Sequence, residues 1–167
     1  MTTRKTEKQL DLALEGAIRD SGEFRSWLLR RTRFAGEDTS IVLTRSNWPW
    51  SRTEVRIWNQ TSQEYDTLIR DGETDLLVVV QSKQLGRFAF HFENKLSGGS
   101  FTPYQADLYR ARAAGWADEK KYGDYQEWST VLVAPLAFYE RNKAESQKFD
   151  IFISHEEVGK FIPLFNA

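Results

Sequence analysis

The segment FAFHFENK, residues 88–95, places a carboxylate and an ammonium group two residues apart at the end of an aromatic run. Side chains alternate between the two faces of a strand, so Glu93 and Lys95 share one face with His91, and the three phenylalanines share the other. Glu93 and Lys95 are therefore candidate functional residues. For His91 we expect a structural role in the core.

A second apolar run, residues 75–80, comes shortly before this segment. The loop between the two runs contains Gly86, which predicts a β-hairpin. One register gives the hairpin an entirely apolar face, because Leu76 then lies opposite Phe92. A slip of one residue would turn these side chains outward, so the hydrophobic pattern fixes the register.

The same register places Asp75 opposite Glu93, with β-carbons about 4.5–5.5 Å apart. Two like charges at this separation destabilise a strand pair unless a positive charge lies between them. A divalent cation would supply that charge, and Lys95 lies beside the pair. The other interpretation is a solvated sheet rim, with both acids in water and Lys95 paired across the hairpin with Glu73.

The remaining pattern predicts one domain over residues 1–167. We expect helices over residues 6–31, 103–120, 137–147 and after Ser154, and strands near 41–43, 55–57, 65–69, 75–80, 88–95, 129–134 and 149–153. Gly22 favours a break in the first helix. Thr102, Pro103 and Gln105 have the spacing of a helix N-terminus with a capping box. This order is typical of the mixed α/β (α+β) class, in which helices flank a mixed sheet.

Asp75 and the run Glu93-Asn94-Lys95, on adjacent strands behind an N-terminal helix, resemble the PD-(D/E)XK nuclease superfamily. The resemblance covers about residues 9–153, although Thr74 stands where the proline of the family name would be. It implies a restriction-endonuclease-like core with the order helix, three strands, helix, strand. It also implies a nuclease that cuts phosphodiester bonds and uses Mg²⁺ or Mn²⁺ as its cofactor. We expect DNA rather than RNA as its substrate.

In that resemblance Asp75, Glu93 and the main-chain carbonyl of Asn94 are metal ligands. Lys95 would orient the attacking water or stabilise charge in the transition state. Glu15 corresponds to the acidic residue that many members carry on the first helix, which would make it a further catalytic and metal-binding residue. The other interpretation of Glu15 is a surface ion pair with Arg19, four residues on.

Gln105 and Tyr109 resemble the Gln-x-x-x-Tyr motif of the exonuclease-like branches of the superfamily. The motif implies a catalytic role for Gln105 and contacts with nucleic acid for both residues. The other interpretations are a capping contact of Gln105 with Thr102 and a core position for Tyr109.

Eight arginines and five acidic residues lie between Arg19 and Arg56, so this segment is positively charged in a chain whose net charge is −1. Arginine binds phosphate with two parallel hydrogen bonds, and tryptophan can stack on bases. We therefore expect Arg45, Trp48 and Arg52 to contact nucleic acid. A core or interface role for the tryptophans is the alternative.

The composition excludes some classes of site and partner. The absence of cysteine excludes disulfides and thiolate metal sites, and no apolar run approaches the roughly 20 residues that span a bilayer. We expect a cytoplasmic protein without a membrane partner, in which a homodimer or a protein partner would assist cleavage of both strands. Two other functions fit the composition: a catalytically inactive nucleic-acid- or protein-binding module on the same fold, and an aromatic-rich carbohydrate-binding domain, which would be largely β.

Overall fold

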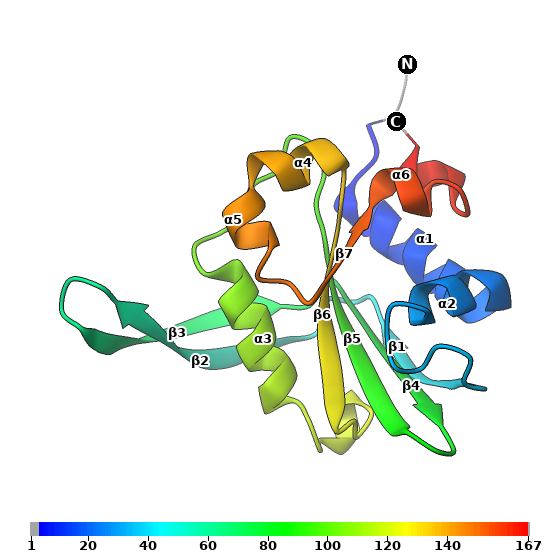
Figure 1. Ribbon diagram of the computed structural model, residues 1–167, viewed down its shortest axis with the longest axis horizontal. Helices are drawn as coiled ribbons and strands as arrows, with labels where there is room; N and C mark the ends of the chain where they lie inside the picture. The colour runs from blue at the N-terminus through cyan, green and yellow to red at the C-terminus, as the bar shows by residue number, and fades with distance from the viewer. Residues whose placement is uncertain (1–3, 167) are drawn as a thin grey trace.

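The computed structural model describes residues 4–166. Its centre is a five-stranded sheet with the strand order β1–β4–β5–β6–β7 (Figure 1). The strands are β1 (Ser40–Arg45), β4 (Leu76–Ser82), β5 (Gly86–Asn94), β6 (Glu127–Ala134) and β7 (Ile151–Ser154). β1, β4 and β5 are antiparallel, whereas β5, β6 and β7 are parallel. The expected mixed sheet is confirmed.

The β4–β5 hairpin has the register that its hydrophobic pattern predicts. Leu76 pairs with Phe92, and Val80 pairs with Phe88. All these side chains are buried in one core with the first helices, so the face that the pattern requires to be apolar is apolar.

One face of the sheet packs against α1 (Glu7–Asp20), α2 (Gly22–Leu29), α6 (His155–Val158) and the 3₁₀ helix η2 (Pro163–Phe165). The expected break in the first helix is present. Ser21 ends α1 and caps α2, and its hydroxyl accepts a hydrogen bond from the main-chain N–H of Phe24 at 3.1 Å. The helix expected after Ser154 is also present as α6, and Ser154 and Glu157 form a capping box at its start.

The other face packs against α3 (Gln105–Gly115), α4 (Leu136–Arg141), α5 (Lys143–Ser146) and the 3₁₀ helix η1 (Lys120–Tyr122). The single helix expected over 137–147 is wrong, because Asn142 divides it. Its backbone leaves the helical region, and its side-chain amide donates to the carbonyl of Phe138 at 3.0 Å. None of the helices between residues 4 and 166 is long and apolar enough to cross a membrane.

Helix α3 is shorter than expected at both ends. Tyr104 has a left-handed backbone with φ of 60°, so the helix starts at Gln105 and not at Pro103. Only half of the predicted capping box forms, since the Gln105 side chain accepts from the N–H of Thr102 but no side chain caps the helix in return. At the other end the helix stops at Gly115, well before the expected residue 120.

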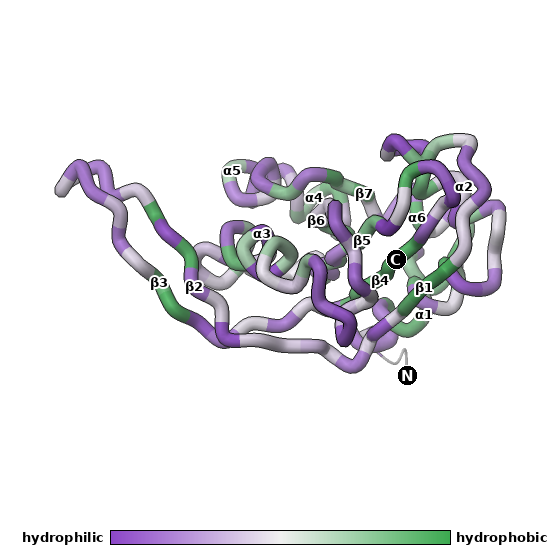
Figure 2. The backbone as a smooth tube through the Cα atoms, turned by 90° about the horizontal axis from the view of Figure 1, so that it is seen from below, coloured by the Kyte–Doolittle hydropathy of each residue, from purple (hydrophilic) through white to green (hydrophobic). Residues whose placement is uncertain are grey.

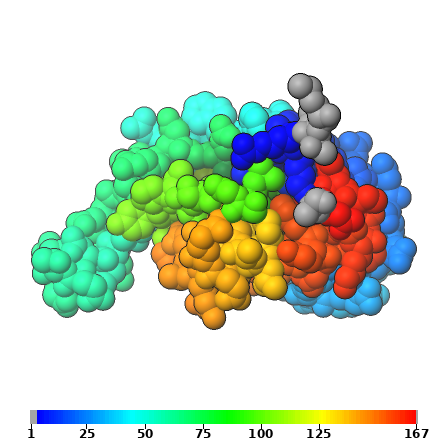
Figure 3. All heavy atoms as spheres, turned by 90° about the horizontal axis from the view of Figure 1, so that it is seen from above, coloured from blue at the N-terminus to red at the C-terminus, as the bar shows by residue number. Residues whose placement is uncertain are grey.

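Strands β2 (Trp50–Asn59) and β3 (Glu64–Glu73) form a separate two-stranded antiparallel ribbon, longer than the short strands expected there. The ribbon extends away from the rest of the molecule, and its outer part stands clear in the space-filling view (Figures 1 and 3). Its residues are mostly hydrophilic, with a few apolar positions between them (Figure 2). At its root, the N–H of Thr74 donates to the carbonyl of Pro49 at 3.0 Å. The root of the ribbon, where Trp50 pairs with Glu73, is therefore hydrogen-bonded next to Asp75.

Candidate active site

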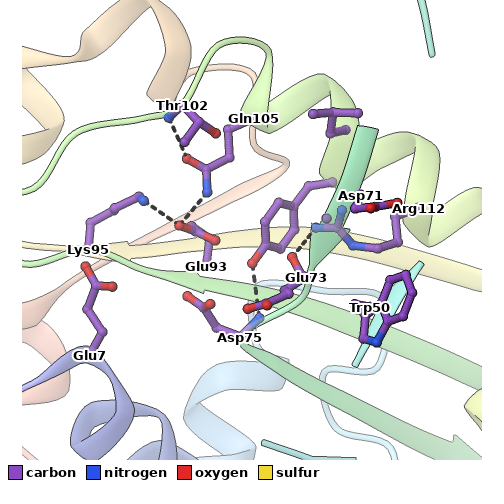
Figure 4. A pocket seen from close by; sticks show the side chains of 13 residues that line it. Glu7, Trp50, Asp71, Glu73, Asp75, Glu93, Lys95, Thr102, Gln105 and Arg112 are labelled. Atoms are coloured by element: carbon purple, nitrogen blue, oxygen red, sulfur yellow. Dashed lines mark hydrogen bonds and ion pairs between the residues drawn. The ribbon is translucent and has the colours of Figure 1, made fainter. Parts of the chain in front are cut away.

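Asp75 and Glu93 lie at the ends of adjacent strands and line one cleft (Figure 4). Asp75 directly precedes β4, and Glu93 follows Phe92, one register step beyond the last pair of the hairpin, which joins Leu76 and Phe92. The cleft has a volume of about 580 Å³ and is lined by Glu7 of α1, the root of the ribbon, the ends of β4 and β5 and the start of α3. The structure thus brings the two carboxylates together.

Lys95 and Gln105 both contact Glu93. Lys95 Nζ lies 2.7 Å from Glu93 Oε1, and Gln105 Nε2 donates to the same oxygen at 2.8 Å. The other end of the Gln105 amide accepts from Thr102, so Gln105 connects the start of α3 to the site. Among the described residues Lys95 makes no ion pair with Glu73, which is exposed. The rim interpretation is therefore wrong for Lys95.

The main chain and Tyr109 fix the position of Asp75. Asp75 Oδ2 accepts from the N–H of Asn94 at 2.8 Å, and the N–H of Asp75 donates to Tyr109 Oη at 3.1 Å. That hydroxyl donates in turn to the carbonyl of Phe92 at 3.1 Å. Tyr109 is only 1% exposed, so the expected contact with nucleic acid is replaced by a buried link between the ends of β4 and β5.

A chain of buried hydrogen bonds holds the residue before Asp75. Arg112 Nε donates to Thr74 Oγ1 at 3.0 Å, and the Thr74 hydroxyl lies 3.0 Å from His91 Nδ1. His91 Nε2 lies 3.0 Å from the hydroxyl of Tyr125, which donates to the carbonyl of Ala113. These partners determine the tautomer: Nε2 carries the proton and Nδ1 accepts. His91 is thus a neutral structural histidine, as expected.

Burial and like charge act together on the acids of the cleft. Burial raises the pKa of Asp75 well above its usual range, and the negative charges of Glu93 and Asp11 raise it further. Burial also raises the pKa of Tyr109 and lowers the pKa of Arg112, which is only 2% exposed. The pKa of His91 is lowered to about 3, because burial disfavours its charged form.

Helix α1 brings Glu7 into the cleft lining and Asp11 against the end of β5, whereas Glu15, expected to be a metal ligand, lies outside the lining. Asp11 is 1% exposed and accepts hydrogen bonds from Trp48 Nε1 at 3.3 Å and from the side-chain amide of Asn94. Burial raises the pKa of Asp11, and the nearby charge of Glu93 contributes to this rise. Glu15 lies one turn further along α1, outside the cleft lining, and pairs with Arg19 at 3.8 Å.

The donor set fits a hard divalent cation. Asp75 and Glu93 offer carboxylate oxygens, which Mg²⁺ and Mn²⁺ prefer, and a cation bound to both would relieve the repulsion by which Glu93 adds to the raised pKa of Asp75. Within residues 4–166 no three His, Cys, Asp or Glu side chains form a complete ligand group. An ion would therefore need further oxygens from water and substrate, as is usual for Mg²⁺. The side chain of Asn94 points toward Asp11, so only its main-chain carbonyl could add a ligand.

The three residues expected to contact nucleic acid in the 45–52 segment lie at different places in the fold. Arg45 lies at the end of β1, paired with Leu77, and Arg52 lies on β2, paired with Asp71. Neither arginine lines the cleft. Trp48 does not line the cleft either, and its link to the site is the hydrogen bond that its indole N–H donates to Asp11.

The sequence analysis did not single out two buried residues, Arg112 in the cleft lining and Asp11 behind it. Asp11 precedes Leu14 and Ile18 at helical spacing, so an acid within the apolar stripe of α1 was the available signal. Arg112 follows Tyr109 by three residues and shares its face of α3. Trp50 belongs to the arginine- and tryptophan-rich segment that the sequence indicates for base stacking, but its place in the cleft depends on where the ribbon starts.

The site thus combines a buried carboxylate, a half-buried carboxylate, a lysine, a glutamine at a helix start and a buried arginine in one cleft. Comparison of the chain with protein-family models, with curated proteins and with solved structures finds no match.

Proposed function

We propose that the protein is a metal-dependent nuclease of the PD-(D/E)XK type, which hydrolyses phosphodiester bonds in DNA. One observation carries the proposal: Asp75 and Glu93 end adjacent strands in one cleft, and Lys95 lies 2.7 Å from Glu93. Two hard carboxylates and a cation within one cleft suit the hydrolysis of a phosphate diester better than any other chemistry the cleft could perform.

The order of elements supports the same proposal. α1, β1, β4, β5, α3 and β6 follow one another in the order of a restriction-endonuclease-like core, with the ribbon β2–β3 inserted after the first strand. Asp75 then precedes the second core strand, and Glu93 and Lys95 lie at the end of the third. The crossover from β5 through α3 to β6 is parallel, as such a core requires.

Asp75 and Glu93 would hold Mg²⁺ or Mn²⁺, with the main-chain carbonyl of Asn94 as a further ligand. Such an ion lowers the pKa of a water molecule and neutralises the charge of the scissile phosphate. Hydrolysis adds the water oxygen to phosphorus, breaks one phosphorus–oxygen ester bond and leaves a proton for the departing oxygen.

Lys95 and Gln105 complete the proposed machinery. The ammonium of Lys95 would stabilise the charge that develops on the phosphate oxygens, since a fixed cation in a partly buried cleft acts strongly on such charge. Gln105 would keep the Glu93 carboxylate in place through its 2.8 Å hydrogen bond. Asp11, which lies behind Asn94, would position the end of β5.

The test is incubation of the protein with linear, nicked and single-stranded DNA in Mg²⁺ or Mn²⁺. Asp75→Asn and Lys95→Ala should each lower the cleavage rate at least about 100-fold. Glu73→Gln is the matched control, because Glu73 lines the same cleft but is exposed, and it should cleave like the wild type. Equal cleavage by the wild type and Lys95→Ala would contradict the proposal. Binding of DNA without cleavage in either metal would indicate an inactive binding module.

A further inference from the structure

We infer that Trp50 stacks on an unpaired base of the substrate, so that the cleft selects nucleic acid with single-stranded character. The inference rests on the proposed function for the position of the scissile phosphate. It starts from Trp50 itself, which is 62% exposed and lines the same cleft as Asp75 and Glu93. Figure 4 shows Trp50 on the opposite side of the cleft from Lys95.

Trp50 differs from the other five tryptophans of the chain. Each of the others has a partner: Trp27 packs on Phe24 and Phe161, Trp48 donates to Asp11, Trp58 packs on Tyr65, Trp116 stacks on Tyr122, and Trp128 packs near Tyr125. Across residues 4–166, no ring, cation or hydrogen-bond acceptor pairs with the Trp50 indole. A large aromatic surface is thus left open at the cleft, where a ligand ring could cover it.

The backbone fixes Trp50 relative to the carboxylates. Trp50 opens β2 and pairs with Glu73, the last residue of β3 and only two residues before Asp75. The hydrogen bond from the N–H of Thr74 to the carbonyl of Pro49 closes the same ribbon root. A base stacked on Trp50 would therefore belong to a nucleotide close to the scissile phosphate.

The negative charge of the cleft favours binding of an unpaired nucleobase over binding of the second phosphate backbone of a duplex. Five acidic residues and two basic residues line the cleft: Glu7, Asp71, Glu73, Asp75, Glu93, Lys95 and Arg112. One divalent ion offsets only part of this negative charge. A duplex would bring a second phosphate backbone toward Asp71 and Glu73, whereas an unpaired base is uncharged and can stack on the indole without that repulsion.

The test measures binding of three fluorescein-labelled probes of about 12 nucleotides: single-stranded oligothymidylate, an abasic strand with the same backbone, and a duplex. Fluorescence anisotropy is recorded in Mg²⁺, with Lys95→Ala as the parent protein so that the probes stay intact. Trp50→Ala should weaken binding of oligothymidylate about 5- to 150-fold, the range expected for one base on an aromatic ring. Trp50→Phe should stay within about threefold of the parent, because it keeps an aromatic face.

Two controls separate stacking from other effects. The parent should bind the abasic strand no better than Trp50→Ala binds oligothymidylate. Trp58→Ala removes another indole, 43% exposed and near the ribbon tip, and should bind like the parent. Because Trp50 is largely exposed, its substitution should leave the unfolding temperature unchanged.

Several results would overturn the inference: unchanged binding of oligothymidylate by Trp50→Ala, an equal loss for the abasic strand or the duplex, an equal loss in Trp58→Ala, or no binding of any probe by the parent. The two proposals fail separately. Metal-dependent cleavage by the wild type with no effect of Trp50→Ala would refute only the role of Trp50. Trp50-dependent binding of single strands without cleavage would refute only the nuclease.

Discussion

Replacing Asp75 with asparagine should stabilise the metal-free protein while abolishing its binding of divalent metal. Asparagine has the same shape and can still accept the hydrogen bond from the N–H of Asn94, which is 2.8 Å long in the wild type. What the substitution removes is the negative charge of a half-buried carboxylate beside Glu93 and near Asp11. A group that lowers stability but is needed for binding is typical of a functional site.

The size of the effect follows from the geometry of the hairpin. Two unit charges about 5 Å apart repel each other by about 3 kcal/mol at an effective dielectric constant of about 20. The attraction of Lys95 for Asp75 opposes part of this repulsion. We therefore expect Asp75→Asn to raise the free energy of unfolding by about 1–3 kcal/mol, or the unfolding temperature by about 2–10 °C for a chain of this size.

The pH dependence has a defined direction. The pKa of Asp75 in the folded protein lies well above its ordinary value of 3.8, so the folded state takes up this proton more readily than the unfolded state. The wild type should then recover stability as the pH falls through the folded pKa, and the advantage of Asp75→Asn should shrink toward pH 3.8.

Thermal unfolding in EDTA across this pH range, together with calorimetry with Mn²⁺ near neutral pH, measures both effects. Asp75→Asn should show higher stability near neutral pH and no heat of Mn²⁺ binding. A variant that is less stable than the wild type near neutral pH, or one that still binds Mn²⁺ at the wild-type affinity, would refute the reasoning.

Three further predictions concern the residues around the carboxylates. Asp11→Asn should weaken Mn²⁺ binding about 10- to 100-fold in calorimetry, as loss of an outer-shell partner does, while Glu15→Gln should leave it unchanged; equal effects of the two would contradict the assignment of Asp11. Thr74→Val should lower the free energy of unfolding in urea by about 2–4 kcal/mol, since it leaves Arg112 Nε and His91 Nδ1 buried without a partner; a loss below about 1 kcal/mol would count against the hydrogen-bond chain. The pKa of His91 falls from 6.5 to about 3 on folding, so its contribution to stability is present above pH 6.5 and is lost as the pH falls below it. Between pH 7 and pH 5 the wild type should lose about 2 kcal/mol more than His91→Gln, and parallel pH profiles of the two would refute a neutral buried histidine.

The residues that could be predicted from the sequence are those that depend on local periodicity. The register of the β4–β5 hairpin followed from the alternation of its phenylalanines, and this register brings Asp75 to Glu93. The break in the first helix followed from the low helix propensity of Gly22, and the structure shows Ser21 as the capping residue. Both depend on residues that are close in the sequence.

The residues that could not be predicted depend on contacts between distant segments. Asp11 rather than Glu15 contacts the end of β5 because Trp48 and Asn94, 37 and 83 residues away, approach that turn of α1. Arg112 is buried because its guanidinium reaches the main-chain carbonyl of Glu73 and the hydroxyl of Thr74. Gly72 permits this approach, since a β-carbon there would lie 2.5 Å from the guanidinium. The hydrophobic periodicity of α3 does not indicate that Arg112 will contact this distant segment.

The most direct test of the shared cation site is a crystal of the wild-type protein soaked in Mn²⁺ and measured for anomalous scattering. The account predicts a peak between Asp75 and Glu93, in contact with a carboxylate oxygen of each, and no peak at this position in a soaked crystal of Asp75→Asn. A peak bound by only one of the two acids, or an empty cleft in a protein that still cleaves DNA in Mn²⁺, would contradict it.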